Sequence, residues 1–178
     1  MKLALFGDGC SAAVFRNEDL MAVKECENGQ WVVENYTSKL VDETSDVVKM
    51  FWNNSGQFDS TISHKLPNIV KEGVHGFVEG MLEEQGLGVA DVDGWAVHPG
   101  GAKILGSVQK ALGLQEDKLT ESYNILKNYG NMASPSVWFV LDQLLKKETN
   151  QSMEHVLALA FGPGISMEGV LMKKYCHF

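Results

Sequence analysis

A histidine at the end of an apolar run is the first residue of this sequence whose setting suggests chemistry. His98 follows Trp95-Ala96-Val97 and is followed at once by Pro99-Gly100-Gly101. A strand that ends on His98 would place the imidazole at the carboxyl edge of a sheet, where ligands of α/β folds usually bind. The two glycines would let a ligand pass close to the backbone. The alternative is that His98 merely completes a tight turn from strand to helix.

Asn131 is the second candidate, in the stretch GNMASP at residues 130–135. It lies just before an expected buried helix, where backbone N–H groups and the helix dipole favour negative charge. The alternative is that asparagine stands here because it tolerates the left-handed backbone of a turn. Because His98 and Asn131 both border helix starts, together they could donate to a developing oxyanion. A third stretch, FGPG at residues 161–164, taken alone indicates only a tight turn between strands.

The helices that would position these residues follow from hydrophobic periodicity. One helix is predicted between Pro67 and about Gly86, because its apolar residues fall on one stripe. This stripe consists of Val70, Val74, Phe77, Val78, Met81 and Leu82. A second helix follows His98 and ends at Gly113. Its inward residues are predicted to be Ile104, Leu105, Val108 and Leu112.

Two further helices are predicted before the last strands. One covers residues 118–128, and the other is capped by Ser134, begins at Pro135 and runs to about Lys147. The middle of the latter, residues 137–141, is apolar all round, so we expect it to be buried on most sides.

Short runs rich in β-formers predict the strands. They are residues 3–6, 11–15, 21–26, 31–36, 47–52, 93–98, 156–161 and 165–172. The pair at 21–26 and 31–36 flanks Asn28-Gly29, a strong hairpin signal, whereas residues 37–57 otherwise indicate a loop. The pattern is mixed α/β without internal repeats.

Composition limits the classes of function. The 178 residues carry a net charge of −8, which argues against nucleic acid or an anionic membrane as the main partner. The three cysteines, Cys10, Cys26 and Cys176, are too widely spaced for a disulfide framework or a metal motif. The opening residues MKLALFGDG form neither a signal peptide nor a membrane span. We therefore expect a cytoplasmic protein without a bound metal or cofactor.

The motifs WAVHPGG, YGNMAS and AFGPG, in this order, resemble the C-terminal motifs of type III polyketide synthases, the chalcone and stilbene synthase family. LFGDGCSAA at residues 5–13 resembles the segment that opens the same domain. The resemblance implies one domain over residues 1–178, the C-terminal half of a thiolase-like α/β fold. It implies a mixed five-stranded sheet with helices on both faces, layered α/β/α, and a homodimer once the protein is complete.

The resemblance also implies a mechanism. In this family a cysteine accepts an acyl group from coenzyme A, and malonyl-CoA loses CO₂ to give an enolate that attacks the acyl-cysteine. His98 and Asn131 would donate to the enolate oxygen. Gly100 and Gly101 would line the pantetheine tunnel, and Lys103 would face coenzyme A phosphates or simply solvent. Phe161, Gly162, Pro163 and Gly164 would shape the cyclisation cavity, together with Ser60 and Ala133, which replace a common aromatic gatekeeper and a common serine.

The catalytic cysteine of the family belongs to an N-terminal half, which we expect to be absent from this chain. Cys10, Cys26 and Cys176 do not match its position, so we expect the chain alone to be inactive and to need that half as its partner. One alternative is a non-catalytic docking or regulatory half-domain, because an isolated half should expose an apolar face. Another is a ketoacyl-carrier-protein synthase III-like enzyme of fatty-acid initiation, which the acidic composition disfavours because carrier proteins are also acidic.

Overall fold

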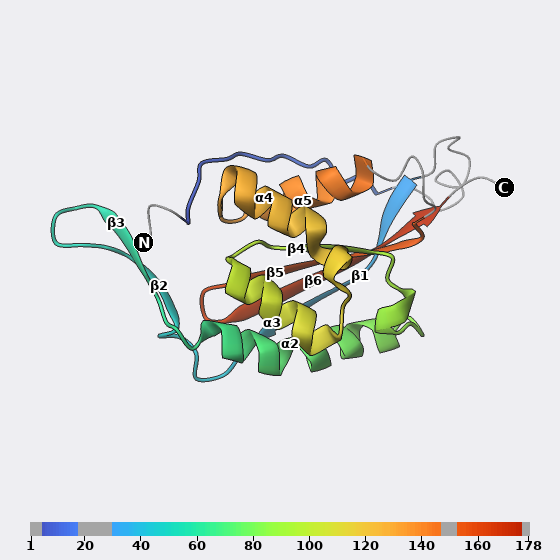
Figure 1. Ribbon diagram of the computed structural model, residues 1–178, viewed down its shortest axis with the longest axis horizontal. Helices are drawn as coiled ribbons and strands as arrows, with labels where there is room; N and C mark the ends of the chain where they lie inside the picture. Colours follow the sequence, from blue (N-terminus) through green and yellow to red (C-terminus); the bar gives the residue numbers. More distant parts are fainter. Residues whose placement is uncertain (1–4, 18–29, 147–152, 176–178) are drawn as a thin grey trace.

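The computed structural model describes residues 5–17, 30–146 and 153–175, and the statements below refer to these (Figure 1). In chain order the elements are β1 (Gln30–Leu40), β2 (Val48–Trp52), β3 (Phe58–Ile62), α2 (Leu66–Glu83), η2 (Val89–Asp91), β4 (Gly94–Val97), α3 (Ala102–Leu112), η3 (Glu116–Leu119), α4 (Thr120–Tyr129), α5 (Pro135–Lys146), β5 (His155–Gly162) and β6 (Ser166–Tyr175). The two labels η2 and η3 denote short 3₁₀ turns.

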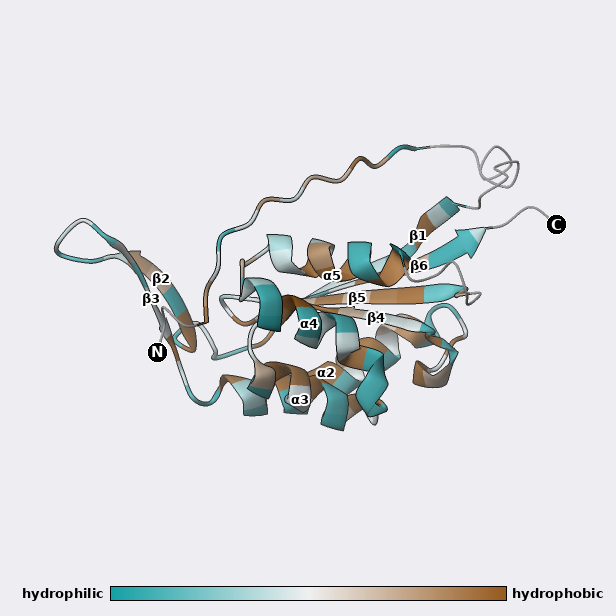
Figure 2. Cartoon of the chain, turned by 45° about the horizontal axis from the view of Figure 1, so that its top comes forward, coloured by the Kyte–Doolittle hydropathy of each residue, from teal (hydrophilic) through white to brown (hydrophobic). Residues whose placement is uncertain are grey.

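A mixed sheet forms the centre, with strand order β1-β6-β5-β4. β4 pairs with β5 in parallel, whereas β6 is antiparallel to both β5 and β1. β5 is apolar along most of its length (Figure 2), as expected for a strand covered on both faces. The described residues thus give a four-stranded sheet where five strands were predicted. The predicted strand at residues 21–26, and with it the Asn-Gly hairpin, lies outside the described residues.

Helices cover both faces of this sheet, so the predicted α/β/α layering is confirmed (Figure 1). α2 contacts β1 and β6 and packs against α3, while α5 contacts β4 and β5 on the other face. Two apolar cores result, one under α2 and α3 and one under α5. Trp95 of β4 is 1% exposed and belongs to the first, and Val140 of α5 belongs to the second.

The helix predictions hold because they depend on local periodicity. α2 buries the six residues of the predicted stripe, and α3 buries the four predicted for it. α3 ends at Gly113, whose φ of 64° is the left-handed conformation that glycine adopts without strain. α5 begins at Pro135 as predicted. Its buried residues are Ser136, Val140, Leu141 and Leu144, but Trp138 is 36% exposed, so the helix is not buried on most sides.

The strand predicted at residues 11–15 is wrong, whereas half of the strand predicted at 3–6 lies outside the described residues. Residues 11–15 form no strand, and in residues 5–17 only Phe6 makes a β-bridge, to Asn131. This segment runs along α5 instead: Cys10, Ser11 and Ala12 lie against that helix, and the Phe15 ring meets Trp138 edge-on at 5.9 Å. A β-prone sequence becomes a strand only where a neighbouring strand edge accepts its hydrogen bonds.

The predicted loop at residues 37–57 is also shorter than expected. β1 continues to Leu40 along β6, and the predicted strand at 47–52 pairs with β3 in a separate two-stranded hairpin. This β2–β3 hairpin projects from the body of the domain (Figure 1).

Candidate active site

His98 lies directly after β4, at the carboxyl edge of the sheet, as its place in the sequence predicted. Its backbone N–H donates to the Leu159 carbonyl oxygen at 2.7 Å and so continues the β4–β5 pairing. Its carbonyl oxygen accepts the Gly100 N–H at 2.9 Å, which closes the turn into α3. A Cβ on Gly100 would stand 3.4 Å from His98 Cδ2, so glycine leaves the imidazole its space.

Burial determines the charge of this imidazole. His98 is 8% exposed, and desolvation lowers its pKa from 6.5 to about 4. No hydrogen bond or ion pair ties the imidazole to another described residue. At neutral pH His98 is therefore an uncharged imidazole with one N–H donor, and its ring borders an open cavity.

Asn131 lies between α4 and α5 and is 7% exposed. Its Nδ2 donates to the Gly100 carbonyl oxygen at 3.4 Å, which links it to the turn after His98. Its Oδ1 accepts the Ala133 N–H at 2.9 Å. The left-handed residues of this loop are Gly130, with φ 74°, and Ala133, with φ 58°. Asn131 is not left-handed, so backbone tolerance does not explain why this residue is an asparagine.

His98 and Asn131 line one cavity of about 410 Å³. Of the other predicted site residues, those that line it are Gly100, Ala133, Phe161, Gly162 and Pro163. Lining residues that the sequence did not single out are Phe6, Val48, Met50, Ile62, Leu66, Ile104, Ser134, Val137, Trp138, Ala160, Ser166 and Glu168. The β2–β3 hairpin and the N-terminal segment thus contribute walls that come from distant parts of the chain.

Four predicted residues lie outside these walls. Lys103 is exposed on the first turn of α3, and Gly101 precedes that helix with a φ of 155°. Ser60 pairs with Met50 across the hairpin, so it is next to a wall residue without lining the cavity itself. Gly164 has a φ of 121° and packs beside Leu40, behind the turn formed by residues 162–164.

Thr44 holds this turn in place, a role that no sequence pattern indicated. Its buried hydroxyl oxygen lies 2.7 Å from the Gly164 carbonyl oxygen and 2.6 Å from that of Val41. The same oxygen accepts the Ile165 N–H at 2.5 Å. The hydroxyl therefore ties the loop after β1 to the turn that forms one wall of the His98 cavity.

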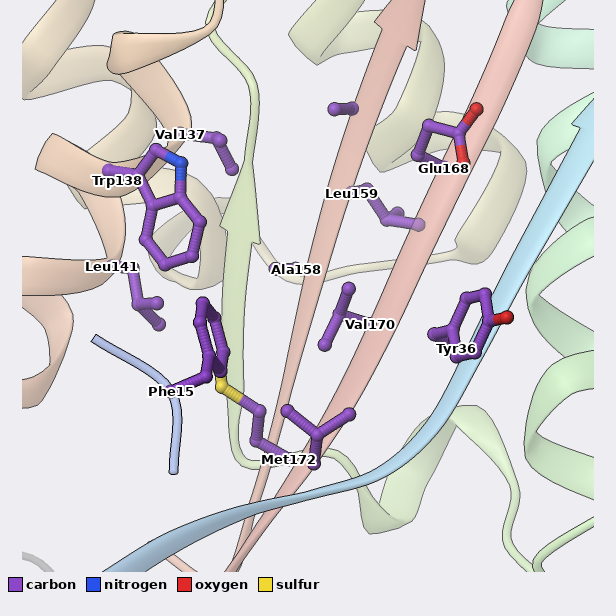
Figure 3. Close-up of a pocket in the computed structure, with 12 residues that line it drawn as sticks. Phe15, Tyr36, Val137, Trp138, Leu141, Ala158, Leu159, Glu168, Val170 and Met172 are labelled. Atoms are coloured by element: carbon purple, nitrogen blue, oxygen red, sulfur yellow. The ribbon is translucent and has the colours of Figure 1, made fainter. Parts of the chain in front are cut away.

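An apolar groove of about 440 Å³ lies on the α5 face of the sheet. Figure 3 shows Phe15 pointing into it beside Met172, with Trp138 of α5 and Tyr36 of β1 on opposite sides. Tyr36 is 74% and Phe15 67% exposed. The groove is an exposed apolar face, the feature on which the docking alternative depends.

Cys10 is exposed and lies against α5, away from the cavity that holds His98. Cys26 and Cys176 lie outside the described residues. In the part of the chain that the structure describes, no cluster of three potential metal ligands is found. None of the helices described there has the length and apolar character to cross a membrane.

The chain is similar to known proteins over most of its length. The family model for chalcone and stilbene synthases, C-terminal domain, matches residues 32–176. The alpha-pyrone synthesis polyketide synthase-like Pks18 of Mycobacterium tuberculosis is 36% identical over 169 residues, which cover 94% of this chain and 42% of that protein. Type III polyketide synthase B of Arabidopsis thaliana is 32% identical over 96% of this chain and 45% of its own.

The fold agrees as well. PKS-I from the brown alga Ectocarpus siliculosus superposes with a TM-score of 0.79 at 33% identity, over 84% of this chain and 41% of that one. This chain thus spans less than half the length of these relatives. The family match covers most of the chain, and the matched part contains His98, Asn131 and the turn that forms the cavity wall. The chain belongs to the chalcone and stilbene synthase family of type III polyketide synthases, of which it carries the C-terminal domain.

Proposed function

We propose that this chain supplies the two hydrogen-bond donors of a decarboxylative condensing site. The observation that carries the proposal is that His98 and Asn131 line one cavity and are linked through the Gly100 turn. In the proposed reaction, malonyl-CoA loses CO₂, and the electron pair of the broken bond becomes an enolate at the thioester oxygen. The His98 N–H and the Asn131 amide donate to this oxygen.

The next step needs a thiolate. The enolate carbon attacks an acyl-cysteine thioester, a carbon–carbon bond forms, and the carbon–sulfur bond breaks to return the thiolate. We place this cysteine in the part of the family proteins that the chain does not span. A thiolate beside His98 would raise the pKa of the imidazole from about 4 and so favour the imidazolium, which in turn stabilises the thiolate. The pair would therefore form only on assembly, and we expect the 178-residue chain alone not to condense malonyl-CoA.

The substrates would be coenzyme A thioesters, and no metal or further cofactor takes part in the proposed steps. Gly100 at the cavity and Gly101 at the start of α3 give the pantetheine arm a surface without side chains. Lys103 is exposed one residue into α3, where it could meet coenzyme A phosphates. The pyrone synthesis named for the mycobacterial relative makes pyrones a reasonable first class of product to assay. A cytoplasmic location and dimerisation of the complete protein remain predictions.

The test is co-expression with the N-terminal portion of a family member, followed by an assay with radiolabelled malonyl-CoA. The assembled protein should release CO₂ and form product, whereas the chain alone should do neither. His98→Gln and Asn131→Ala should each lower the decarboxylation rate, by about 10²–10³-fold for the loss of one oxyanion donor. A variant of a residue outside the cavity, Lys110→Ala, is the matched control. Product formation by the chain alone, or full activity of both site variants, contradicts the proposal.

The apolar groove favours a second candidate, a non-catalytic module that docks onto a complete synthase. Trp138, Phe15 and Tyr36 leave a large apolar surface beside α5, which a partner would cover. In that case the chain should bind a complete synthase, and the activity of that synthase should still depend on the synthase's own histidine and asparagine. The same co-expression experiment separates the two candidates, because only the first predicts loss of activity in His98→Gln. The relatives reported above are polyketide synthases, which disfavours fatty-acid initiation.

A further inference from the structure

Residues 5–9 cross the loop that carries Asn131, and hydrogen bonds join the two backbones. The Asn131 N–H donates to the Leu5 carbonyl oxygen at 2.7 Å, and the Gly7 N–H donates to the Asn131 carbonyl oxygen at 3.0 Å. Both backbone polar groups of Asn131 are thus held by one short segment, which forms a parallel β-bridge through Phe6. This segment lies before residues 32–176, the stretch that the family model matches.

Glycines make this crossing possible. A Cβ on Gly7 would stand 1.9 Å from the Tyr129 carbonyl oxygen, and one on Gly130 would stand 2.9 Å from the Leu5 carbonyl oxygen. Both obstacles are backbone atoms, which cannot rotate away as the end of a side chain can. The chains therefore approach this closely only because neither residue has a side chain.

The crossing also connects to the cavity. Phe6 lines it together with His98 and Asn131. The Asn131 side-chain amide reaches the Gly100 carbonyl oxygen at 3.4 Å, so a shift of the Asn131 backbone would move the amide relative to the turn after His98. The direction of this donor thus depends on a segment about 120 residues earlier in the chain.

We propose that residues 5–9 are a backbone clamp that orients Asn131, with Gly7 as a positioning residue that acts through Asn131 and does not touch the substrate. The catalytic consequence rests on the function proposed above, whereas the clamp itself is a property of this chain. From the sequence, LFGDG resembled only the start of the segment that opens the domain. The crossing gives a structural reason for glycine at position 7, the first glycine of LFGDG.

The clamp can be tested in the 178-residue chain by NMR. In the wild-type protein, a scalar coupling across the hydrogen bond should connect the Asn131 amide nitrogen to the Leu5 carbonyl carbon. In Gly7→Ala this coupling should vanish, the side-chain amide resonances of Asn131 should shift, and exchange of its N–H should accelerate by about tenfold or more. Gly76→Ala is the control, because a Cβ at Gly76 meets nothing within 4 Å.

Two results would overturn the clamp. One is the absence of the coupling in the wild-type chain. This measurement does not require Gly7→Ala to fold. The other is a folded Gly7→Ala protein whose Asn131 resonances and exchange match those of the control. Protection of the β5 amides should be the same in both variants, which separates a local change at Asn131 from general destabilisation.

A double-mutant cycle tests the catalytic consequence in the assembled enzyme. Gly7→Ala should lower kcat by about 10²-fold with little change in KM, as the loss of one oriented oxyanion donor does. Gly7→Ala combined with Asn131→Ala should be no slower than Asn131→Ala alone, because both changes remove the same donor. If the rate losses of the two single variants multiply in the double variant, Gly7 does not act through Asn131, and its role as a positioning residue is overturned. If Asn131→Ala itself has no effect, the proposed function fails, while the coupling still decides whether the clamp exists.

Discussion

The buried imidazole of His98 should make the stability of this chain depend on pH. Its pKa is lowered from 6.5 to about 4 by burial, so between these values the unfolded chain binds a proton that the folded chain does not. The free energy of unfolding therefore rises with pH across this window. The part of it that depends on a neutral His98 is fully present above about pH 6.5 and is lost as pH falls toward 4. The full difference corresponds to about 3 kcal/mol. Between pH 7.5 and 5.0 the expected loss is about 2 kcal/mol.

Urea denaturation at these two pH values, with wild type and His98→Gln in parallel, measures this loss. Glutamine keeps a neutral polar side chain but does not titrate, so wild type should lose about 2 kcal/mol more than the variant. Glu168, which lines the same cavity, is present in both proteins, as are His64, His75, His155 and His177, and their effects cancel. Equal losses in the two proteins, or an NMR titration of His98 near pH 6.5, would refute the reasoning.

Three further predictions concern residues that support the site, each read by urea denaturation at pH 7.5. Thr44→Val removes the hydroxyl that holds the turn at Gly164 and should cost about 1–3 kcal/mol, whereas Thr44→Ser should keep most of the stability. Ser122→Ala leaves the buried Val97 carbonyl oxygen without its 2.7 Å hydrogen bond and should cost about 1–3 kcal/mol. Leu105→Ala opens a cavity at a position that is 0% exposed and should cost about 2–5 kcal/mol. A cost below about 0.5 kcal/mol, typical of surface sites, would contradict any of the three.

The helices could be predicted from the sequence because the information is local. The stripe on α2 and the end of α3 at Gly113 depend on periodicity of 3.6 and on one glycine, and both agree with the structure. The exposure of Trp138 could not be predicted in the same way. An apolar helix indicates burial against something, but the sequence does not say whether the covering surface lies in the same chain.

The strands were harder because their partners are distant. Residues 11–15 have the composition of a strand and remain without a strand partner, while β1 extends to Leu40 because β6 is there to pair with it. The cavity shows the same limit. His98 and Asn131 stood out through their own settings, but Phe6 and Met50 line the same space only because separate segments fold back toward it.

The two donors of the proposed site share one structural principle. Each is fixed to the fold through backbone hydrogen bonds, His98 to Leu159 and Asn131 to residues 5–7, and both residues line the cavity. Chemistry and positioning are therefore separable by mutation. Replacing His98 or Asn131 removes a donor from an intact frame, whereas replacing Gly7 keeps both donors and disturbs the frame. For this reason a glycine that precedes residues 32–176, the stretch matched by the family model, is expected to affect the proposed reaction as strongly as a residue that meets the substrate.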